Sequence, residues 1–320
     1  MLHIFWIHSH ITFLLSREVI KEIDEDDEIL VFLSREYSMP FSIEKSNVQV
    51  VSFPWYRESN KSPHNILLKS NVYRTRRNVR TCKAQLSNYL NRRAFLLYIP
   101  TSWEYTIGML MTDRLCTGYF YIEEGSLSYL PNGKELNNSF IRKIVAKSVY
   151  NLSYFGMLSV TSKFLGSYAS STEAFPWNKK RKYLIDITPI SKYFDDYSDI
   201  ERILIFDHLI METEDLNKLV DFLCVYFKRY RKGSIGYKFH PATKSKPFKE
   251  NYIRERLLEI EACELPENFV VELYLAGKSK ALYSINRNSS LLIYAKRLGS
   301  KAFVVVPDVS NSNYFQIEQL

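Results

Sequence analysis

The chain has 320 residues, of which 46% are hydrophobic and 24% are charged. This balance excludes an intrinsically disordered chain, and the length is typical of a globular protein with two domains. Glycine is scarce, with 10 residues, which argues against Gly-rich phosphate loops and repeat solenoids. The net charge of +8 suits an anionic partner such as a nucleotide-sugar, a nucleic acid or a lipid surface. A charge of this size can also serve only to keep the protein in solution.

The four cysteines lie far apart and form no CxxC pair. We therefore expect Cys82, Cys116, Cys224 and Cys263 to be reduced thiols of a cytoplasmic protein. The histidines form no HExxH pattern and no Cys/His cluster, so we expect no metal site. The apolar run at residues 1–7 is short and lacks a basic flank and a cleavage site, which predicts a buried strand rather than a signal peptide or a membrane span.

Apolar runs separated by helical patterns organise the first half of the chain. The runs predict strands over residues 3–7, 29–33, 48–53, 94–99 and 118–122. The patterns between them predict helices over residues 11–22, 73–91, 104–115 and 138–150, and the second of these helices is strongly basic. Short apolar strands that alternate with helices are typical of a parallel sheet in an α/β fold.

The pattern breaks down between residues 165 and 200, which we interpret as a connector. A second α/β pattern follows it, with residues 269–275 fitting either a helix or a strand. This pattern predicts strands over 203–206, 234–239, 280–285 and 301–306, and helices over 213–231, 251–260 and 289–297. The order fits two Rossmann-like halves around a cleft, and ligands of such folds bind outside the carboxyl ends of the strands.

A first polar motif, Glu123-Glu124-Gly125, follows the predicted strand at 118–122. Its glycine permits a sharp turn, and a carboxylate at the end of a strand can take a proton from a hydroxyl group. Because adjacent strand residues point to opposite sides, only one of the two carboxylates is expected to face an acceptor. Taken alone, the motif is more typical of a solvated acidic turn.

A second motif, Lys238-Phe239-His240-Pro241, ends another strand. The proline holds His240 in an extended conformation, and an imidazole at a strand end can protonate or hydrogen-bond a departing phosphate. A histidine that caps a strand at the surface is the alternative interpretation.

A third motif, Ser289-Ser290, opens a predicted helix. Two hydroxyls at a helix N-terminus can hold a phosphate, although serine is also an ordinary N-cap. Glu272 lies among apolar residues in the segment 265–273, where it could accept hydrogen bonds from a ribose diol or lie at the surface of a helix.

Together, these motifs resemble those of the bacterial sialyltransferases that carry a D/E-D/E-G motif, an HP motif and an S/SS motif. This family includes lipooligosaccharide sialyltransferases and capsule polysialyltransferases. The match lies in the order and context of the motifs and extends over nearly the whole chain. Residues 7–11, with Ser9 and His10, and the segment 265–272 are also similar to the family.

The resemblance implies a GT-B fold, in which two Rossmann-like domains face a central cleft. Residues 1–195 would form an acceptor-binding domain, and residues 196–320 a CMP-sugar-binding domain. The implied reaction is the inverting transfer of sialic acid from CMP-sialic acid to a galactose-terminated or lipid-linked glycan, in the synthesis of a surface polysaccharide or lipooligosaccharide. It would need no metal and no other cofactor, and it would take place in the cytoplasm or on the cytoplasmic face of the inner membrane.

Carried onto this chain, the resemblance makes Glu123 or Glu124 the general base. Many relatives have an aspartate in this motif, so the choice between the two glutamates stays open. His240 would stabilise or protonate the CMP leaving group. The resemblance places donor-binding groups at Lys238, Pro241, Glu272, Ser289 and Ser290, and an acceptor or active-site loop at Ser9, His10 and Gly125.

Other interpretations follow from the same residues. The fold could use another CMP-activated nonulosonic acid as its donor. A basic nucleic-acid-binding protein would use the Arg-rich region at 74–93, but this region lacks a helix-turn-helix, RRM or zinc-finger pattern, so we expect no nucleic-acid partner. The segment 175–182 places aromatic residues beside a basic cluster, which fits either peripheral contact with an anionic inner-membrane leaflet or a solvated connector.

Overall fold

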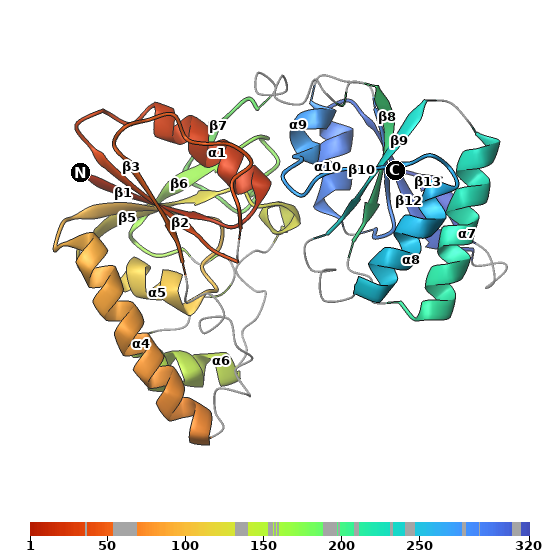
Figure 1. Ribbon diagram of the computed structural model, residues 1–320. Coiled ribbons are helices and arrows are strands. Elements are labelled where there is room, and N and C mark those ends of the chain that lie inside the picture. The colour runs from red at the N-terminus through yellow and green to blue at the C-terminus, as the bar shows by residue number, and fades with distance from the viewer. Residues whose placement is uncertain are drawn as a thin grey trace. The chain divides into compact units, whose positions relative to one another are not determined.

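The chain folds into two compact units in the computed structural model (Figure 1), Met1–Asp186 and Ile187–Leu320, which we call the first and second unit. The predicted domain boundary at residues 195–196 lies outside the described residues. The side chains of residues 69–71 are likewise not described. The structure describes residues 1–35, 37–53, 69–131, 140–152, 156, 158, 160–187, 197, 199–207, 211–230, 233–240, 247–276, 280–287, 289–308 and 315–320.

The first unit is built on a seven-stranded sheet with the strand order β3-β2-β1-β4-β5-β6-β7. All of its strand pairs are parallel. The strands are β1 (Leu2–Ile7), β2 (Glu28–Leu33), β3 (Val48–Ser52), β4 (Phe95–Ile99), β5 (Cys116–Ile122), β6 (Phe164–Ala169) and β7 (Arg181–Leu184). The helices are α1 (His10–Lys21), α4 (Lys69–Leu90), α5 (Tyr105–Thr112) and α6 (Phe140–Val145), with a 3-10 helix (Ser126–Tyr129) and a π-helix (Ala146–Tyr150).

Helices cover both faces of this sheet, which is why its central strands β1, β2 and β4 are almost wholly apolar. Alternate residues of a strand point to opposite faces. Leu2, Ile4 and Trp6 of β1 therefore pack in one core, together with apolar residues of α4 and α5. Helix α1 lies on the other side of the sheet (Figure 1).

The second unit is built on a six-stranded sheet with the strand order β10-β9-β8-β11-β12-β13. Only β13 is antiparallel to its neighbour among the described strands. The strands are β8 (Ile200–Phe206), β9 (Ser234–Phe239), β10 (Cys263–Glu264), β11 (Ala281–Ser284), β12 (Lys301–Pro307) and β13 (Phe315–Gln319). The helices are α7 (Thr213–Arg229), α8 (Pro247–Leu258), α9 (Val271–Leu275) and α10 (Ser290–Arg297).

The two faces of the second sheet bury separate cores. Leu204 and Phe206 of β8 pack with α7 and α8, whereas Ile203 and Ile205 pack with α9 and α10. This alternation confirms the prediction of a second α/β unit. It also settles the ambiguous segment 269–275, whose last five residues form helix α9.

The interpretation of residues 165–200 as a connector is wrong, because this segment contains most of β6 and all of β7. β7 ends the described sheet, so one edge of the strand is unpaired and its charged residues, such as Arg181, fit a strand. Phe175 is fully buried, and Trp177 packs against the same core. The aromatic residues of the segment 175–182 therefore contribute to the core. No helix in the described ranges is long and apolar enough to cross a bilayer.

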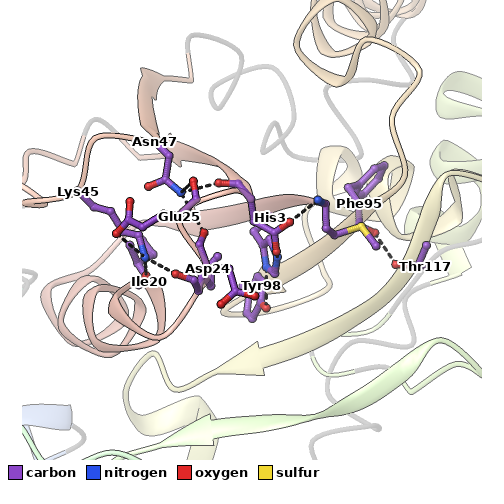
Figure 2. Close-up of polar contacts among 12 residues, drawn as sticks. His3, Ile20, Asp24, Glu25, Lys45, Asn47, Phe95, Tyr98 and Thr117 are labelled. Carbon is purple, nitrogen blue, oxygen red and sulfur yellow. Dashed lines mark hydrogen bonds and ion pairs between the residues drawn. The ribbon is translucent and has the colours of Figure 1, made fainter.

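Polar contacts, some of them buried, hold the amino ends of the central strands (Figure 2). The ring of His3, on β1, lies 3.1 Å from the hydroxyl of Tyr98 on β4 and 3.1 Å from a carboxyl oxygen of Asp27. Asn47 donates from its side-chain amide to the carbonyls of Asp24 and Glu25, both at 3.2 Å. These contacts tie the turn before β2 to β1 and to the start of β3.

Burial lowers the pKa of His3, although Asp27 opposes this effect. The unfolded chain therefore binds a proton at His3 near its ordinary pKa of 6.5, while the folded chain does not. Stability should fall as the pH drops below this value, by at most about 1.4 kcal/mol per pH unit.

We expect His3→Gln to weaken this dependence, as measured by urea unfolding of the full chain at several pH values. The matched control is Tyr98→Phe, which removes a contact but keeps the imidazole and should keep the slope. The same slope in wild type and His3→Gln would contradict the assignment.

Candidate active site

Polar side chains gather at the carboxyl edge of the first sheet. The chain leaves β1 toward β2 on one side and returns as β4 on the other, so the point between β1 and β4 is a topological switch point. His8 follows β1, Glu104 lies beyond β4 as the N-cap residue of α5, and the motif at 123–125 follows β5. Ligands of open α/β sheets bind at such points.

Glu123 is fully buried, and its carboxyl group accepts hydrogen bonds from neighbouring segments of the first unit. One oxygen accepts a hydrogen bond from the hydroxyl of Tyr129. The other accepts from the backbone N–H of Ser170 at 2.7 Å and from the hydroxyl of the same residue at 2.9 Å. These three donors come from the 3-10 helix and from the end of β6, so this side chain joins β5 to its neighbours.

Glu124 is placed differently from Glu123. One of its carboxyl oxygens lies 2.6 Å from Nε2 of His8, and the two side chains are 5% and 2% exposed. The other oxygen, Oε1, is buried and has no hydrogen-bond partner among the described residues. Leaving a buried carboxyl oxygen without a protein partner is costly, and a catalytic role is one explanation for such an atom.

His8 lies between two acidic side chains. Its second ring nitrogen, Nδ1, is 4.0 Å from Oε1 of Glu104 and makes no hydrogen bond within the described ranges. Burial raises the pKa of Glu104, and the guanidinium of Arg35, 3.5 Å away, opposes the shift. Four strands thus contribute to one polar cluster, made of His8, Arg35, Glu104 and Glu124.

The predicted loop residues lie at the start of α1 and in the turn after β5. Ser9 is the N-cap of α1, and its hydroxyl accepts from the backbone N–H of Thr12 at 3.4 Å. His10 is the first residue of α1, and its ring lies 3.0 Å from the hydroxyl of Tyr37. Gly125 has φ 134°, a conformation that side chains rarely adopt, so the motif requires glycine at its third position.

The second sheet has a switch point between β8 and β11. The hydroxyl of Ser284, at the end of β11, donates to Asp207, at the end of β8, over 2.7 Å. Both residues are buried. The backbone N–H of Asn286 donates to the hydroxyl of Ser284 at 3.1 Å, which fixes the turn that leads to α10.

The HP motif lies at the same edge of the second sheet. His240 is half-buried, and its backbone N–H donates to the carbonyl of Phe206 at 2.9 Å, so it extends the pairing of β9 with β8. Lys238 donates to the backbone carbonyls of Pro266, Glu267 and Phe269. Burial lowers the pKa of Lys238 to about 8. Pro241 lies outside the described residues.

The remaining predicted residues sit at the starts of two helices. Ser289 is the buried N-cap residue of α10, without a side-chain capping bond, and Ser290 is the first residue of that helix. Glu272 is a buried residue in the first turn of α9. Burial raises the pKa of Glu272, and nearby Lys238 opposes this effect.

Sequence reasoning did not assign roles to His8, Glu104, Asp207 or Ser284. His8 and Asp207 each follow a predicted strand directly, so their positions could have predicted that they lie at the carboxyl edges of the sheets. Glu104 lies five residues beyond β4, and only the fold brings it to His8. In the described part of the chain, no group of three or more His, Cys, Asp and Glu residues is arranged to hold a metal ion.

No known protein-family model matches this chain, and no curated protein matches it in sequence. Its fold matches solved structures. The GT-B domain of a sialyltransferase from Photobacterium damselae gives a TM-score of 0.54 at 12% identity, over 94% of this chain and 89% of that one. UDP-GlcNAc 2-epimerase from Neisseria meningitidis gives 0.55 at 14% identity, over 96% and 83%. UDP-GlcNAc 2-epimerase from Methanocaldococcus jannaschii gives 0.51 at 11% identity, over 96% and 84%.

The fold is GT-B. At this level of sequence identity, the similarity establishes the architecture alone. The matching structures include a transferase and two epimerases, which catalyse different reactions. The activity therefore has to be argued from the residues at the carboxyl edges of the two sheets.

The different environments of the two glutamates predict different effects on stability. The carboxyl group of Glu123 accepts three hydrogen bonds, and Glu123→Gln replaces one of its oxygens by an amide group that cannot accept them. This change should lower the free energy of unfolding by about 2–3 kcal/mol. Glu124→Gln, the matched control, disturbs one described contact and should cost less than about 1 kcal/mol. Urea unfolding of both variants tests this difference, and equal losses would contradict it.

Proposed function

We propose that the protein is an inverting sialyltransferase that moves sialic acid from CMP-sialic acid to a hydroxyl of a galactose-terminated glycan. The observation that carries this proposal is the buried carboxyl group of Glu124, which His8 contacts at 2.6 Å and which keeps one oxygen without a described partner. The GT-B fold and the motif order along the chain support it.

Of the two motif glutamates, Glu124 is the better candidate for the general base. The carboxyl of Glu123 already accepts from Tyr129 and Ser170, so taking a proton from an acceptor would disrupt contacts between strands. Glu124 has a spare oxygen for the acceptor hydroxyl, and His8 orients its other oxygen. A base positioned in this way is typically worth roughly 10²–10⁴ in rate.

In the proposed reaction, the bond between the anomeric carbon and the phosphate oxygen of CMP breaks, and CMP leaves with the electron pair. The acceptor oxygen forms the new bond from the opposite side of the sugar, and its proton passes to Glu124. Negative charge grows on the departing phosphate, which the imidazole of His240 and the amino end of α10, with Ser289 and Ser290, would stabilise.

Glu272 would bind the ribose of CMP, and Lys238 would act indirectly. The ammonium of Lys238 donates to the carbonyls before α9, so it holds Glu272 in place. The leaving group is good enough that the reaction requires no metal. We place the reaction in the cytoplasm, where a lipid-linked glycan on the inner face of the membrane would be accessible.

The proposed activity is tested by CMP release from CMP-sialic acid in EDTA, with and without lactose as an acceptor. Release that lactose stimulates supports the proposal. Release from another CMP-nonulosonic acid alone would change the donor. Interconversion of UDP-GlcNAc and UDP-ManNAc, with no CMP release, would replace the transferase by an epimerase.

Substitutions distinguish the proposed roles of the site residues. Glu124→Gln and His240→Ala should each lower kcat by roughly 10²–10³. Because Glu123→Gln leaves the proposed base intact, its kcat should fall less than tenfold under conditions where it is folded. A larger loss for Glu123→Gln than for Glu124→Gln, measured by single-turnover transfer, would reverse the assignment of the base.

A further inference from the structure

Helix α4 and the segment Phe140–Tyr150, formed by α6 and the π-helix, make a strongly basic part of the first unit. Both segments contain lysine and arginine but no aspartate or glutamate. Figure 1 shows α6 beside α4, on the side of the sheet opposite α1. We call the outer side of these two helices the α4–α6 face.

Internal contacts fix the two helices against each other. Val79 of α4 packs in one buried cluster with Val145, Ala146 and Val149. The guanidinium of Arg76 donates to the carbonyl of Ser148 at 2.9 Å. The ammonium of Lys83 donates to the carbonyl of Tyr150 at 3.3 Å. Both side chains are held by backbone carbonyls of the first unit. A partner of this face would therefore bind mainly to the other lysine and arginine side chains.

The outer residues of α4 form a stripe of mixed character. Tyr73, Arg77 and Arg80 are spaced i, i+4, i+7, so they lie on one side of the helix. Tyr73 is 76% exposed. Within the described residues, neither Arg77 nor Arg80 forms an ion pair, so no described carboxylate neutralises their charges.

The outer residues of α6 repeat this pattern. Phe140, Lys143 and Ile144 are spaced i, i+3, i+4, and Lys147 of the π-helix is also exposed. Phe140 is 74% exposed and Ile144 is 38% exposed. Large apolar side chains are thus held in water directly beside cations on both helices, which burial of the helices against the sheet does not require.

We propose that the α4–α6 face docks on the surface of an anionic lipid bilayer. Cations interspersed with aromatic and aliphatic side chains suit the headgroup region, where phosphates meet the start of the acyl chains. A nucleic acid would use the cations and could stack on Tyr73 and Phe140, but it offers no apolar layer for Ile144. This inference is independent of the proposed sialyl transfer.

The face differs from the segment 175–182, which sequence reasoning considered for the same role. Phe175 of that segment is buried, and Trp177 is partly buried against the same core. Lys179 and Lys180 are exposed, so the exposed side chains of that segment are mainly charged. It therefore supplies a control with the same change of charge in the same unit.

The experiment is flotation of the full chain with vesicles of phosphatidylcholine, with or without phosphatidylglycerol, at low salt. We expect binding only to the anionic vesicles. Arg77→Glu/Arg80→Glu should partition at least about 25-fold more weakly, because each basic residue near an anionic surface is worth roughly fivefold. Lys179→Glu/Lys180→Glu should partition nearly as wild type. Thermal unfolding verifies that each variant is folded.

A second variant, Tyr73→Ser/Phe140→Ser, keeps every charge and should also bind more weakly, by at least about tenfold. Equal losses in the two charge-reversal variants would overturn the proposal, because binding would then depend on net charge. Wild-type binding by the Tyr73→Ser/Phe140→Ser variant would overturn it as well. Tighter binding of a single-stranded RNA oligonucleotide than of anionic vesicles, lost in Arg77→Glu/Arg80→Glu, would assign the face to nucleic acid instead.

Discussion

Parallel pairing of buried strands is the constraint on which the rest of this structure depends. Every described strand of the first sheet, and all but one of the second, runs parallel to its neighbours, so each connection must cross a face of the sheet. All parallel strands of a sheet then end at the same edge. Residues far apart in the sequence, such as His8 and Glu124, meet there because each lies within two residues of the end of a strand.

This constraint explains how much of the protein could be predicted from the sequence. Continuous apolar runs identify buried parallel strands, so the two-unit α/β architecture followed from periodicity alone. The edge strand β7 was missed because an edge strand tolerates charge and carries no such run. Glu104 was missed for another reason. It belongs to the polar cluster because the fold brings it close to His8, and no local sequence pattern encodes that proximity.

The pair of adjacent glutamates shows why a motif alone does not assign roles. Two identical side chains follow β5, yet one is enclosed by donors from Tyr129 and Ser170 and the other meets His8. Neighbouring residues at a strand end point in opposite directions, so they enter different environments. One carboxyl group therefore joins the strands, while its neighbour is the general base that we propose.

The hydrogen bonds of Lys238 to the loop before α9 limit which sequence changes this region can accept during evolution. Its ammonium is bound by three backbone carbonyls, and a carbonyl is present whichever residue occupies the position. The exposed residues of the loop before α9, at 266–268, can thus change their side chains provided that the path of the loop is kept, whereas the buried Leu265 and Phe269 are held by the core. A change at Lys238 itself would remove the contacts between the strand of the HP motif and the loop that leads to Glu272.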